Sequence, residues 1–385
     1  MENFSFVNPV KILFGKGTIG QIKGEIPAGD KVLVVYGGGS IKKNGVYGQV
    51  ADALSGYEVH EFPGIEPNPQ YETCMKVVAL IKEKGIDYLL AVGGGSVIDA
   101  VKFIVAAVYY EGGDPWEILS KDAEIKKALP FGAILTLPAT GSEMNGNSVI
   151  SRAGIQEKLS FASPLVYPKF SVLDPTTTYT LPPRQVGNGV VDTFVHITEQ
   201  YLTHYEGDSM LQDKLFEGLL KTIVAEGPKA LETPTDYDVR ANLMWASTWA
   251  LNGWFGNGRP QDWATHMIGH ELTAFYGLDH GQTLAIVLPG VMKVMWKSKF
   301  EKIRSLGCEV FGVCGADQAS TVDKTIKAVE DFFEAMGVKT HLSDYGLDEE
   351  AIDKVCKRME ERRWKLGECD DITPDMIREI LTLRR

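Results

Sequence analysis

The sequence predicts an α/β domain built on a parallel sheet, followed by an all-α domain. Three observations predict this. Short apolar runs alternate with helical segments up to about residue 180, and two of these runs end in the same glycine-rich turn. After Leu181-Pro-Pro-Arg184, helical spacing continues with almost no strand-like runs. Because 385 residues exceed one ordinary core, we expect two domains, residues 1–183 and 184–385.

Four runs in the first half predict strands that are buried on both faces. They are almost continuously apolar, which is typical of parallel sheets with helices on both sides. These runs are Lys31–Tyr36, Tyr88–Val92, Phe131–Leu137 and Phe170–Leu173. Residues 71–84 lie between the first two, and Cys74, Val77 and Ile81 share one helical face there. The alternation predicts a doubly wound, Rossmann-like domain.

In the second half of the sequence, apolar residues recur at the spacing of α-helices. Its clearest apolar stripe recurs at the spacing of one helix face and comprises Val322, Ile326, Val329, Phe333 and Met336. Thr373-Pro374-Asp375 is typical of a helix start, with an N-cap, a proline at the first position and an acid in the first turn. We therefore predict a helical domain, with the double proline Pro182-Pro183 as the hinge.

Composition narrows the class of protein. The net charge of −12 argues against a broad basic face for nucleic acid or anionic lipid. No apolar stretch approaches the roughly 18 residues of a membrane span, and the first residues lack the pattern of a secretory signal. The five cysteines are odd in number and have no C-x-x-C spacing. We expect reduced thiols in a cytoplasmic protein.

The glycine-rich turns predict a dinucleotide site. Gly37-Gly-Gly-Ser40 and Gly93-Gly-Gly-Ser96 both follow predicted strands, where bare N–H groups and a helix N-terminus can receive phosphate oxygens. A third turn, Thr136–Asn147, offers polar side chains at Thr140, Ser142, Asn145 and Asn147, and Lys158 follows on a β-like segment. The alternative is that these are ordinary tight turns between strand and helix.

The first turn also predicts which dinucleotide binds. An NAD site usually has a carboxylate at the end of this strand, where it holds the adenosine 2′-OH. Here glycines, Ser40 and two lysines, Lys42 and Lys43, stand instead, and no acid in the turn repels a 2′-phosphate. The sequence therefore favours NADP(H). The alternative is that both lysines point to solvent and that either cofactor binds.

Four histidines and an aspartate predict a divalent-metal site. Asp192 and His196 are four residues apart, as are His266 and His270, so each pair shares a helix face. We expect Gly277 to end the second helix and His280 to lie in the loop that follows. One carboxylate and three imidazoles would suit Zn²⁺, Fe²⁺, Mn²⁺ or Ni²⁺. One histidine is then in excess, and the pattern leaves open which one.

Several motifs together resemble the iron-containing (group III) alcohol dehydrogenases. They are GGGSVID at 93–99, ATGSEMN at 139–145, LDPTTTYTLPP at 173–183, GVVDTFVHITEQY at 189–201 and HMIGHELTAFYGLDHGQTLAIVLP at 266–289. YGGGSIKKNG at 36–45, PQDWATHMIGHELTA at 260–274 and HLSDYGLD at 341–348 are most similar to the YqhD-type aldehyde reductase and butanol dehydrogenase branch. The resemblance implies the dehydroquinate synthase-like fold, with a Rossmann-like and a helical domain.

The resemblance also implies roles for individual residues. The metal ligands would be Asp192, His196, His266 and His280, and His270 would stand unligated near the substrate. The cofactor would contact Gly37, Gly38, Gly39, Ser40, Gly94, Gly95, Ser96, Thr136, Thr140, Ser142, Asn147 and Lys158. Dimers through the N-terminal segment around Phe4 to Phe14 are typical of the family.

These expectations lead to one function. The chain would be a metal-dependent alcohol dehydrogenase that reduces short- to medium-chain aldehydes with NADP(H), with His270, Asp192 and His280 as catalytic residues. The alternative is an NAD(H)-dependent butanol dehydrogenase. Between 241 and 292 the only basic side chain is Arg259, which favours uncharged substrates and argues against a phosphate-eliminating lyase. We expect Trp254 or Phe255 to reach the substrate. A non-catalytic metal or nucleotide sensor would need a partner surface that the sequence does not indicate.

Overall fold

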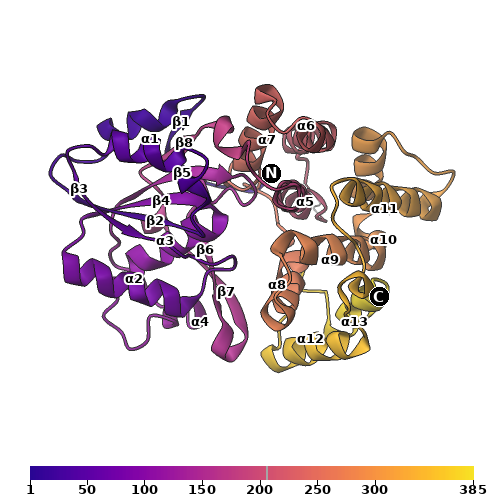
Figure 1. Cartoon of the computed structure of the whole chain (residues 1–385). Coiled ribbons are helices and arrows are strands. Elements are labelled where there is room, and N and C mark those ends of the chain that lie inside the picture. Colours follow the sequence, from indigo (N-terminus) through magenta and orange to yellow (C-terminus); the bar gives the residue numbers. More distant parts are fainter. Residues whose placement is uncertain (205–206) are drawn as a thin grey trace. The chain divides into compact units, whose positions relative to one another are not determined.

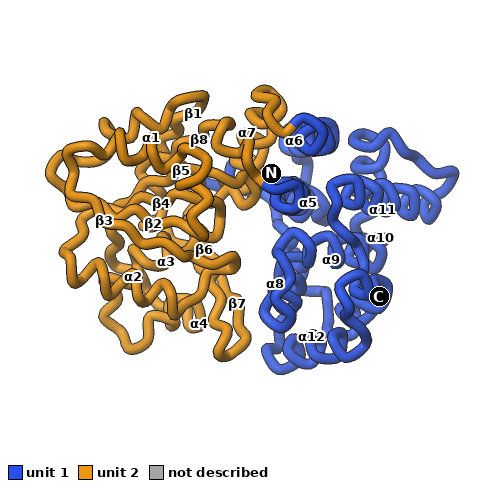
Figure 2. Tube along the Cα trace, in the orientation of Figure 1, with its two compact units in different colours: residues 1–6, 182–233, 253–385 blue, residues 7–181, 234–252 orange. Residues whose placement is uncertain are grey.

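The computed structural model describes residues 1–204 and 207–385 (Figure 1). The chain forms two compact units, which are considered separately (Figure 2). The α/β unit comprises residues 7–181 and 234–252, and the helical unit comprises residues 1–6, 182–233 and 253–385. The domain limits drawn from the sequence stay a prediction.

The α/β unit is built on a parallel sheet, as predicted. Among the described residues the sheet has six strands in the order β1-β8-β5-β4-β2-β3. The strands are β1 Lys11–Phe14, β2 Lys31–Tyr36, β3 Glu58–Phe62, β4 Tyr88–Gly94, β5 Phe131–Leu137 and β8 Phe170–Leu173. The four strands predicted from apolar runs are confirmed. β1 and β3 were not predicted, because both are short edge strands with exposed polar residues and carry a weaker apolar pattern.

Each face of the sheet is covered by different elements. Val32 and Val34 of β2 pack in one apolar core with Ile19 and Val50. Leu33 and Val35 alternate to the other face and join the core of α2 and α3. The helices are α1 Val46–Ala53, α2 Tyr71–Lys84, α3 Gly95–Ala107, α4 Glu117–Ser120 and α7 Tyr237–Ala250. Figure 1 shows α1 and α2 on opposite sides of the sheet, which confirms the doubly wound arrangement.

An antiparallel pair of strands is added to this unit. β6 (Asn147–Arg152) pairs with β7 (Glu157–Ala162), and Ser151 lies opposite Lys158. The β-like segment expected around Lys158 is therefore a strand of this hairpin. Its short connection, Ala153–Ile155, ends at Gln156, which adopts a left-handed conformation with φ 53°.

The helical unit contains the long helices of the second half of the chain. They are α5 Pro183–Tyr201, α6 Met210–Glu232, α8 Ala264–Tyr276, α9 His280–Val294, α10 Trp296–Ser305, α11 Gln318–Ala335, α12 Glu349–Arg362 and α13 Pro374–Thr382. The stripe predicted within 318–335 is buried, and Val322, Val329 and Phe333 are each at most 1% exposed. The predicted cap is also present, because the Thr373 hydroxyl accepts a hydrogen bond from the Met376 N–H.

Two expectations were wrong in this unit. His280 does not lie in a loop but is the first residue of α9, because Asp279 and Gln282 form a capping box that starts the helix there. Cys308 and Cys314 were expected as free thiols but form a disulfide, with Cα atoms 5.4 Å apart; Cys308 lies within the π-helical turn Leu306–Phe311, and Cys314 follows it. That turn brings together two cysteines whose spacing gave no such signal.

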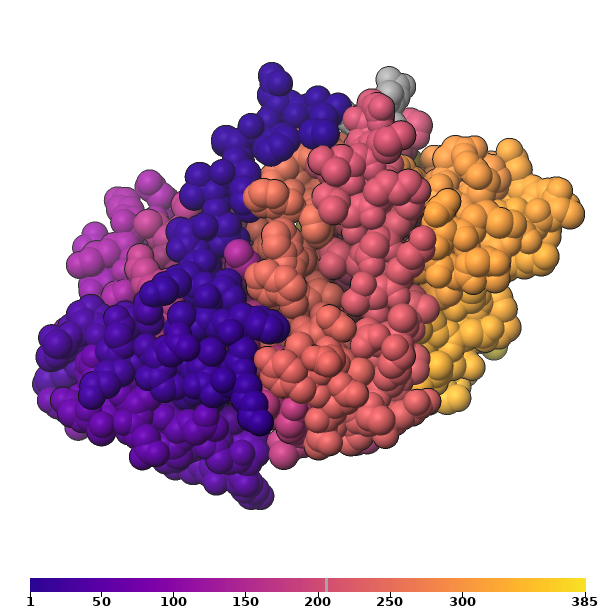
Figure 3. All heavy atoms as spheres, turned by 90° about the horizontal axis from the view of Figure 1, so that it is seen from above, coloured from indigo at the N-terminus to yellow at the C-terminus, as the bar shows by residue number. Residues whose placement is uncertain are grey.

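The surface of the N-terminal segment is apolar in places. Met1 and Phe4 are each 54% exposed, and the N-terminal part of the chain, drawn in indigo, lies on the face seen in Figure 3. Phe6 packs edge-on against Trp254 with ring centroids 5.1 Å apart. None of the described helices is long and apolar enough to cross a membrane.

Candidate metal centre and cofactor site

Helix α5 presents two candidate ligands on one buried face. Asp192 and His196 are 3% and 4% exposed, and they lie one turn apart. Apolar neighbours such as Val191 and Val195 are fully buried, so the helix is enclosed on several sides. The buried face of α5 therefore carries a carboxylate and an imidazole whose side chains have little room to change rotamer.

Helices α8 and α9 bring the other histidines to the same place. Gly277 ends α8 with φ +69°, and α9 begins three residues later. The start of α9 approaches α5 so closely that a Cβ atom on Gly281 would lie 2.6 Å from the Asn188 carbonyl oxygen. The Asn188 amide donates to Asp279 at 2.7 Å, which fixes this contact. Only glycine fits at position 281 without displacing the α5 backbone.

One oxygen of Asp192 lies among three imidazoles from three helices. Its Oδ1 is 3.2 Å from His196 Nδ1, 3.6 Å from His280 Nε2 and 3.8 Å from His266 Nε2. His270 is close as well, with its ring centroid 5.4 Å from that of His280. The structure therefore brings together all five residues that the sequence singled out.

The atoms at the centre of this cluster fit a metal ion. Ligand atoms of Asp192, His196 and His266 lie within 4.8 Å of one another. Among the described residues, Asp192 Oδ1, His196 Nδ1 and His266 Nε2 are buried and have no hydrogen-bond partner. Leaving such groups unsatisfied is costly. A divalent cation with nitrogen and oxygen ligands would satisfy all three together.

The electrostatics of the cluster fit a cation as well. Burial lowers the pKa of His196 to about 4, despite the opposing effect of Asp192, so its ring is neutral and can serve as a ligand. For His266 burial also lowers the pKa, but the carboxylates of Glu199 and Asp192 outweigh it and raise the pKa to about 9. The carboxylates of Glu199 and Asp192 thus favour a positive charge at this place.

Two residues of this centre were missed by the sequence reasoning. Glu199 accepts hydrogen bonds from His266 and is 3% exposed. It follows Asp192 and His196 at helical spacing, which was the available signal. Trp263 packs against the cluster, with its ring 5.5 Å from that of His266 and 6.2 Å from that of His196.

The two aromatics that were expected to reach substrate have other contacts. Phe255 is buried and packs edge-on against Phe216 at 5.6 Å. Trp254 is 50% exposed and packs against Phe6. The ring of Trp263, by contrast, lies against the candidate ligands His196 and His266.

The glycine-rich turns lie at the carboxyl edge of the parallel sheet. β2 pairs with β4, and β4 pairs with β5, so the turns that follow them are neighbours. A Cβ atom on Gly95 would lie 2.5 Å from Thr140 Oγ1, and one on Gly94 would lie 2.9 Å from the Leu137 side chain. Thr136 lies opposite the break in register between Gly93 and Gly94. These glycines allow the third turn to approach the start of α3.

A buried lysine holds the third turn in shape. Lys102 is fully buried, and its ammonium donates to Ser142 Oγ at 2.8 Å, Asn145 Oδ1 at 2.8 Å and the Asn147 carbonyl at 2.7 Å. Ser142 in turn donates to Asp99 at 2.5 Å. Burial lowers the pKa of Lys102 to about 8, against the opposing effect of Asp99. Sequence reasoning missed Lys102, although a lysine inside an apolar helix was a signal.

The other predicted cofactor residues have the following places. Gly38 and Ser40 are exposed after β2, Gly37 and Gly39 are half-buried, and Ser96 is half-buried in the first turn of α3. Asn147 is exposed at the start of β6. Lys158 is 5% exposed and donates to Asn68 Oδ1 at 3.0 Å.

The NADP(H) prediction did not take one neighbouring residue into account. The turn itself contains no acid, but Glu61 on the neighbouring strand β3 pairs with Val34 of β2 and brings a carboxylate close to it. Its carboxylate forms an ion pair with Lys42 at 2.8 Å and accepts hydrogen bonds from Tyr36 and Tyr47. Hydrogen bonding to Glu61 is the main cause that raises the pKa of Lys42. Both lysines are exposed, but Lys42 is paired with the carboxylate of Glu61.

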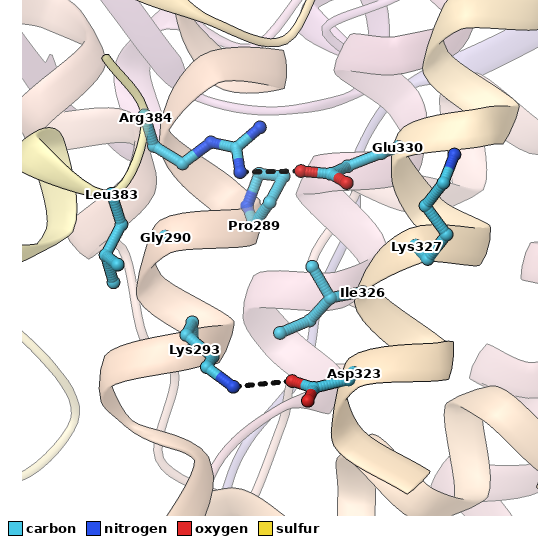
Figure 4. A pocket seen from close by; sticks show the side chains of 9 residues that line it. All are labelled: Pro289, Gly290, Lys293, Asp323, Ile326, Lys327, Glu330, Leu383 and Arg384. Carbon is cyan, nitrogen blue, oxygen red and sulfur yellow. Dashed lines mark hydrogen bonds and ion pairs between the residues drawn. The ribbon is translucent and has the colours of Figure 1, made fainter. Parts of the chain in front are cut away.

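A separate pocket lies elsewhere in the helical unit. It has a volume of about 270 Å³ and is lined by parts of α9 and α11 and by Leu383 and Arg384 (Figure 4). Two ion pairs, Lys293–Asp323 at 2.5 Å and Arg384–Glu330 at 2.6 Å, cross it. None of the five candidate metal-site residues lines this pocket, so it is distinct from the centre described above.

Two family models match almost the whole chain. Residues 9–175 match the model described as iron-containing alcohol dehydrogenase. Residues 187–383 match the model described as the C-terminal part of the Fe-containing alcohol dehydrogenase family.

Individual proteins are similar over the full length. The NADPH-dependent aldehyde reductase YqhD of Escherichia coli is 54% identical over 388 residues and is covered completely, as is this chain. A probable NADH-dependent butanol dehydrogenase of Bacillus subtilis is 42% identical, with 93% of each chain covered. The crystal structure of E. coli YqhD matches with a TM-score of 0.98 and 53% identity, covering 100% of this chain and 99% of that one. That of Thermotoga maritima NADH-dependent butanol dehydrogenase A matches with a TM-score of 0.94 and 40% identity, at the same coverage.

Proposed function

This chain belongs to the iron-containing alcohol dehydrogenase family, and on that premise we propose that it is a metal-dependent aldehyde reductase that uses NADP(H). One observation carries the proposal. Three buried polar atoms, Asp192 Oδ1, His196 Nδ1 and His266 Nε2, have no hydrogen-bond partner among the described residues and face one point. A 54% identical relative named as an NADPH-dependent aldehyde reductase supports the substrate class and the cofactor.

Four side chains would hold the metal. Asp192, His196, His266 and His280 would form a four-ligand set of one oxygen and three nitrogens. Iron or zinc suits such a set. When bound, the metal supplies Lewis-acid stabilisation of the charge that develops on the aldehyde oxygen. Asp192 and His280 are catalytic in this sense, through the ion that they hold.

His270 would handle the proton. Its ring is 6% exposed and lies beside His266 and His280, with centroid distances of 6.2 and 5.4 Å. It is the fifth residue of the cluster, and the other four residues would complete the coordination of the metal. We assign it to proton delivery to the alcohol oxygen, directly or through water.

The α/β unit would bind the dinucleotide. The N–H groups at Gly94, Gly95 and Ser96, at the start of α3, would receive the pyrophosphate. The third turn, held by Lys102, would contribute Thr140 and neighbouring polar groups. The cofactor supplies hydride chemistry, which no side chain can perform. Gly38, Ser40 and Lys43 would meet the adenosine 2′ side.

A second candidate differs in the cofactor. The chain would then be an NADH-dependent butanol dehydrogenase, as several relatives near 40% identity are named. The Glu61–Lys42 ion pair favours this alternative, because it places a carboxylate beside the first turn and neutralises one of the two lysines there. NADP(H) remains the main proposal, because the most similar of the relatives named above uses NADPH.

The substrate would be uncharged. Arg259, the only basic residue between 241 and 292, pairs with Asp213 at 2.8 Å and also donates to Thr203 and to the Tyr201 carbonyl. The charge of Arg259 is compensated by Asp213 inside the helical unit, so this guanidinium is not available to bind an anionic substrate. We also propose a cytoplasmic homodimer, for which the exposed side chains of Phe4, Val7 and Phe14 would supply apolar contact area.

One experiment tests the proposal. The purified protein is analysed for bound metals and then assayed with NADPH and with NADH across short- and medium-chain aldehydes. We expect about one divalent ion per chain and faster loss of NADPH absorbance. Full activity in a metal-free preparation would exclude the metal-dependent mechanism, and a preference for NADH would select the second candidate.

A further inference from the structure

Glu199 holds one of the candidate ligands by two separate atoms. It lies on α5, three residues after His196, and is 3% exposed. Its Oε1 accepts a hydrogen bond from the backbone N–H of His266 at 3.1 Å, and its Oε2 is hydrogen-bonded to His266 Nδ1. One carboxylate thus contacts both the main chain and the ring of the same residue.

The position of His266 in its helix explains the first of these bonds. His266 is the third residue of α8, where backbone N–H groups have no partner within the helix. A carboxylate is favourable there, because it satisfies an N–H group and complements the helix dipole. The backbone carbonyl of Glu199 also accepts from Asp262 N–H at 3.0 Å, and the Asp262 carboxylate accepts from Ala264 N–H at 2.7 Å. The end of α5 therefore fixes the start of α8.

The second bond decides which nitrogen of His266 is available. A histidine binds a metal as the neutral ring; in that form, with the Nδ1 hydrogen donated to Glu199, the lone pair is on Nε2. That nitrogen is buried, has no hydrogen-bond partner in the described part of the chain, and lies 3.8 Å from Asp192 Oδ1. The ring therefore presents its acceptor to the centre of the cluster.

We infer that Glu199 is a positioning residue for the metal: it sets the tautomer and the ring orientation of His266 and thereby strengthens metal binding. The inference rests on the proposed metal site but names a residue that does not touch the ion. Carboxylates that hold metal-bound histidines in this way typically contribute about 10- to 100-fold to metal affinity. The double contact with backbone and ring makes the orientation stricter than one hydrogen bond would.

Glutamine is the informative replacement. Both oxygens of Glu199 accept hydrogen bonds, whereas glutamine has one acceptor oxygen and an amide that only donates. Glu199→Gln keeps the size of the side chain but leaves either the His266 N–H or its Nδ1–H without an acceptor. Glu199→Asp keeps the charge with one methylene less, so we expect an intermediate effect.

A matched control separates this role from the general loss of a buried charge. Glu217 on α6 is 4% exposed and accepts hydrogen bonds from Tyr201 at 3.0 Å and Lys214 at 2.6 Å. These two contacts use different oxygens of Glu217, so Glu217→Gln removes a buried charge and one acceptor oxygen as Glu199→Gln does, but at a residue that does not touch His266. We expect it to bind metal like the wild type.

The experiment measures Zn²⁺ alone. Each chelator-treated variant is titrated with Zn²⁺ in competition with a chromophoric chelator, and its melting temperature is recorded without metal and with Zn²⁺. Glu199→Gln should bind Zn²⁺ about 10- to 100-fold more weakly than the wild type. Its melting temperature should therefore rise less on adding Zn²⁺, and the visible spectrum of its Co²⁺ form should change.

Two results would overturn the inference. One is a Glu199→Gln variant with wild-type Zn²⁺ affinity. The other is a variant that melts earlier by the same amount with and without Zn²⁺, which would mean that Glu199 only caps α8. A wild type that binds Zn²⁺ but fails to reduce aldehydes would contradict the proposed function and leave this inference standing. A wild type without Zn²⁺ affinity would remove both.

Discussion

The candidate metal centre and the first glycine turn expose their residues to very different degrees. Asp192, His196 and His266 are at most 7% exposed and lie on helices that pack around them. Gly38 and Ser40 are exposed, and of the two lysines that follow them, Lys42 is engaged by Glu61. At the metal centre, burial fixes the geometry of the side chains that would bind the ion. At the turn, exposed backbone N–H groups would bind the cofactor, and its preference for NADPH or NADH would depend on a few surface charges.

The largest effect is expected at the buried centre. Asp192→Ala removes the oxygen that lies among three imidazoles, and we expect turnover to fall by roughly 10³-fold or more, because a Lewis acid supplies several kcal/mol. Metal content should fall with it, while NADPH binding persists. The measurements are elemental analysis, steady-state rates and NADPH fluorescence titration. Asp331→Ala, on the exposed part of α11, serves as the control. Retained turnover would mean that Asp192 contributes to the packing of the helical unit but not to catalysis.

A smaller effect is expected at the buried support of the cofactor turn. Lys102→Met leaves Ser142, Asn145 and the Asn147 carbonyl without their shared donor. Unsatisfied buried groups cost about 1–3 kcal/mol, so we expect a lower melting temperature and weaker NADPH binding with unchanged Zn²⁺ affinity. Calorimetry and fluorescence titration measure these quantities. The control is Lys76→Met on the exposed side of α2. Unchanged NADPH affinity would mean that the turn keeps its shape without Lys102.

Burial also explains which features the sequence predicted. The apolar run 31–36 and the spacing of Asp192 and His196 are local patterns, and both lie where the patterns predicted. The edge strand Glu58–Phe62 was missed, because Glu58, His60 and Glu61 interrupt its apolar pattern and the segment resembles a loop. Missing that strand also hid Glu61, whose position beside Lys42 depends on pairing between two strands.

In the candidate site, too, local patterns were predicted and contacts between elements were missed. The sequence singled out five residues that the structure brings together, although the choice of ligands among them stays a prediction. Glu199 and Trp263 were missed, because their contacts depend on how α5 meets the start of α8. His280 was placed in a loop, because the capping pair Asp279 and Gln282 was overlooked. Contacts within one element follow from spacing, whereas contacts between elements need the fold.

A third variant tests the exposed turn directly. A Cβ atom on Gly38 would meet no heavy atom within 4 Å, and its φ is not in the left-handed region, so Gly38→Asp should fold normally. The new carboxylate would repel a 2′-phosphate and could accept from a 2′-OH. We expect the NADPH-to-NADH ratio of kcat/KM to fall about tenfold or more, since like charges in contact are unfavourable. Gly38→Asn is the uncharged control. An unchanged ratio would mean that the 2′ position lies away from this turn.

The smallest effect is expected from the surface ion pair beside that turn. Glu61→Gln releases Lys42 from its carboxylate partner at 2.8 Å and lets the ammonium interact with a 2′-phosphate instead. Since Lys42 is an exposed side chain screened by solvent, we expect kcat/KM for NADPH to rise by no more than about fivefold, with a gain that shrinks as salt is added. Glu58→Gln on the same strand, whose partners are Lys31 and His60, is the matched control and should change neither cofactor's kinetics. A salt-independent gain would point to a change in the shape of the turn, because a charge effect must weaken with ionic strength. An unchanged kcat/KM for NADPH would mean that Ser40, Lys43 and the backbone, without Lys42, contact the adenosine end of the cofactor. The exposed turn would then select its ligand by geometry, as the buried centre does.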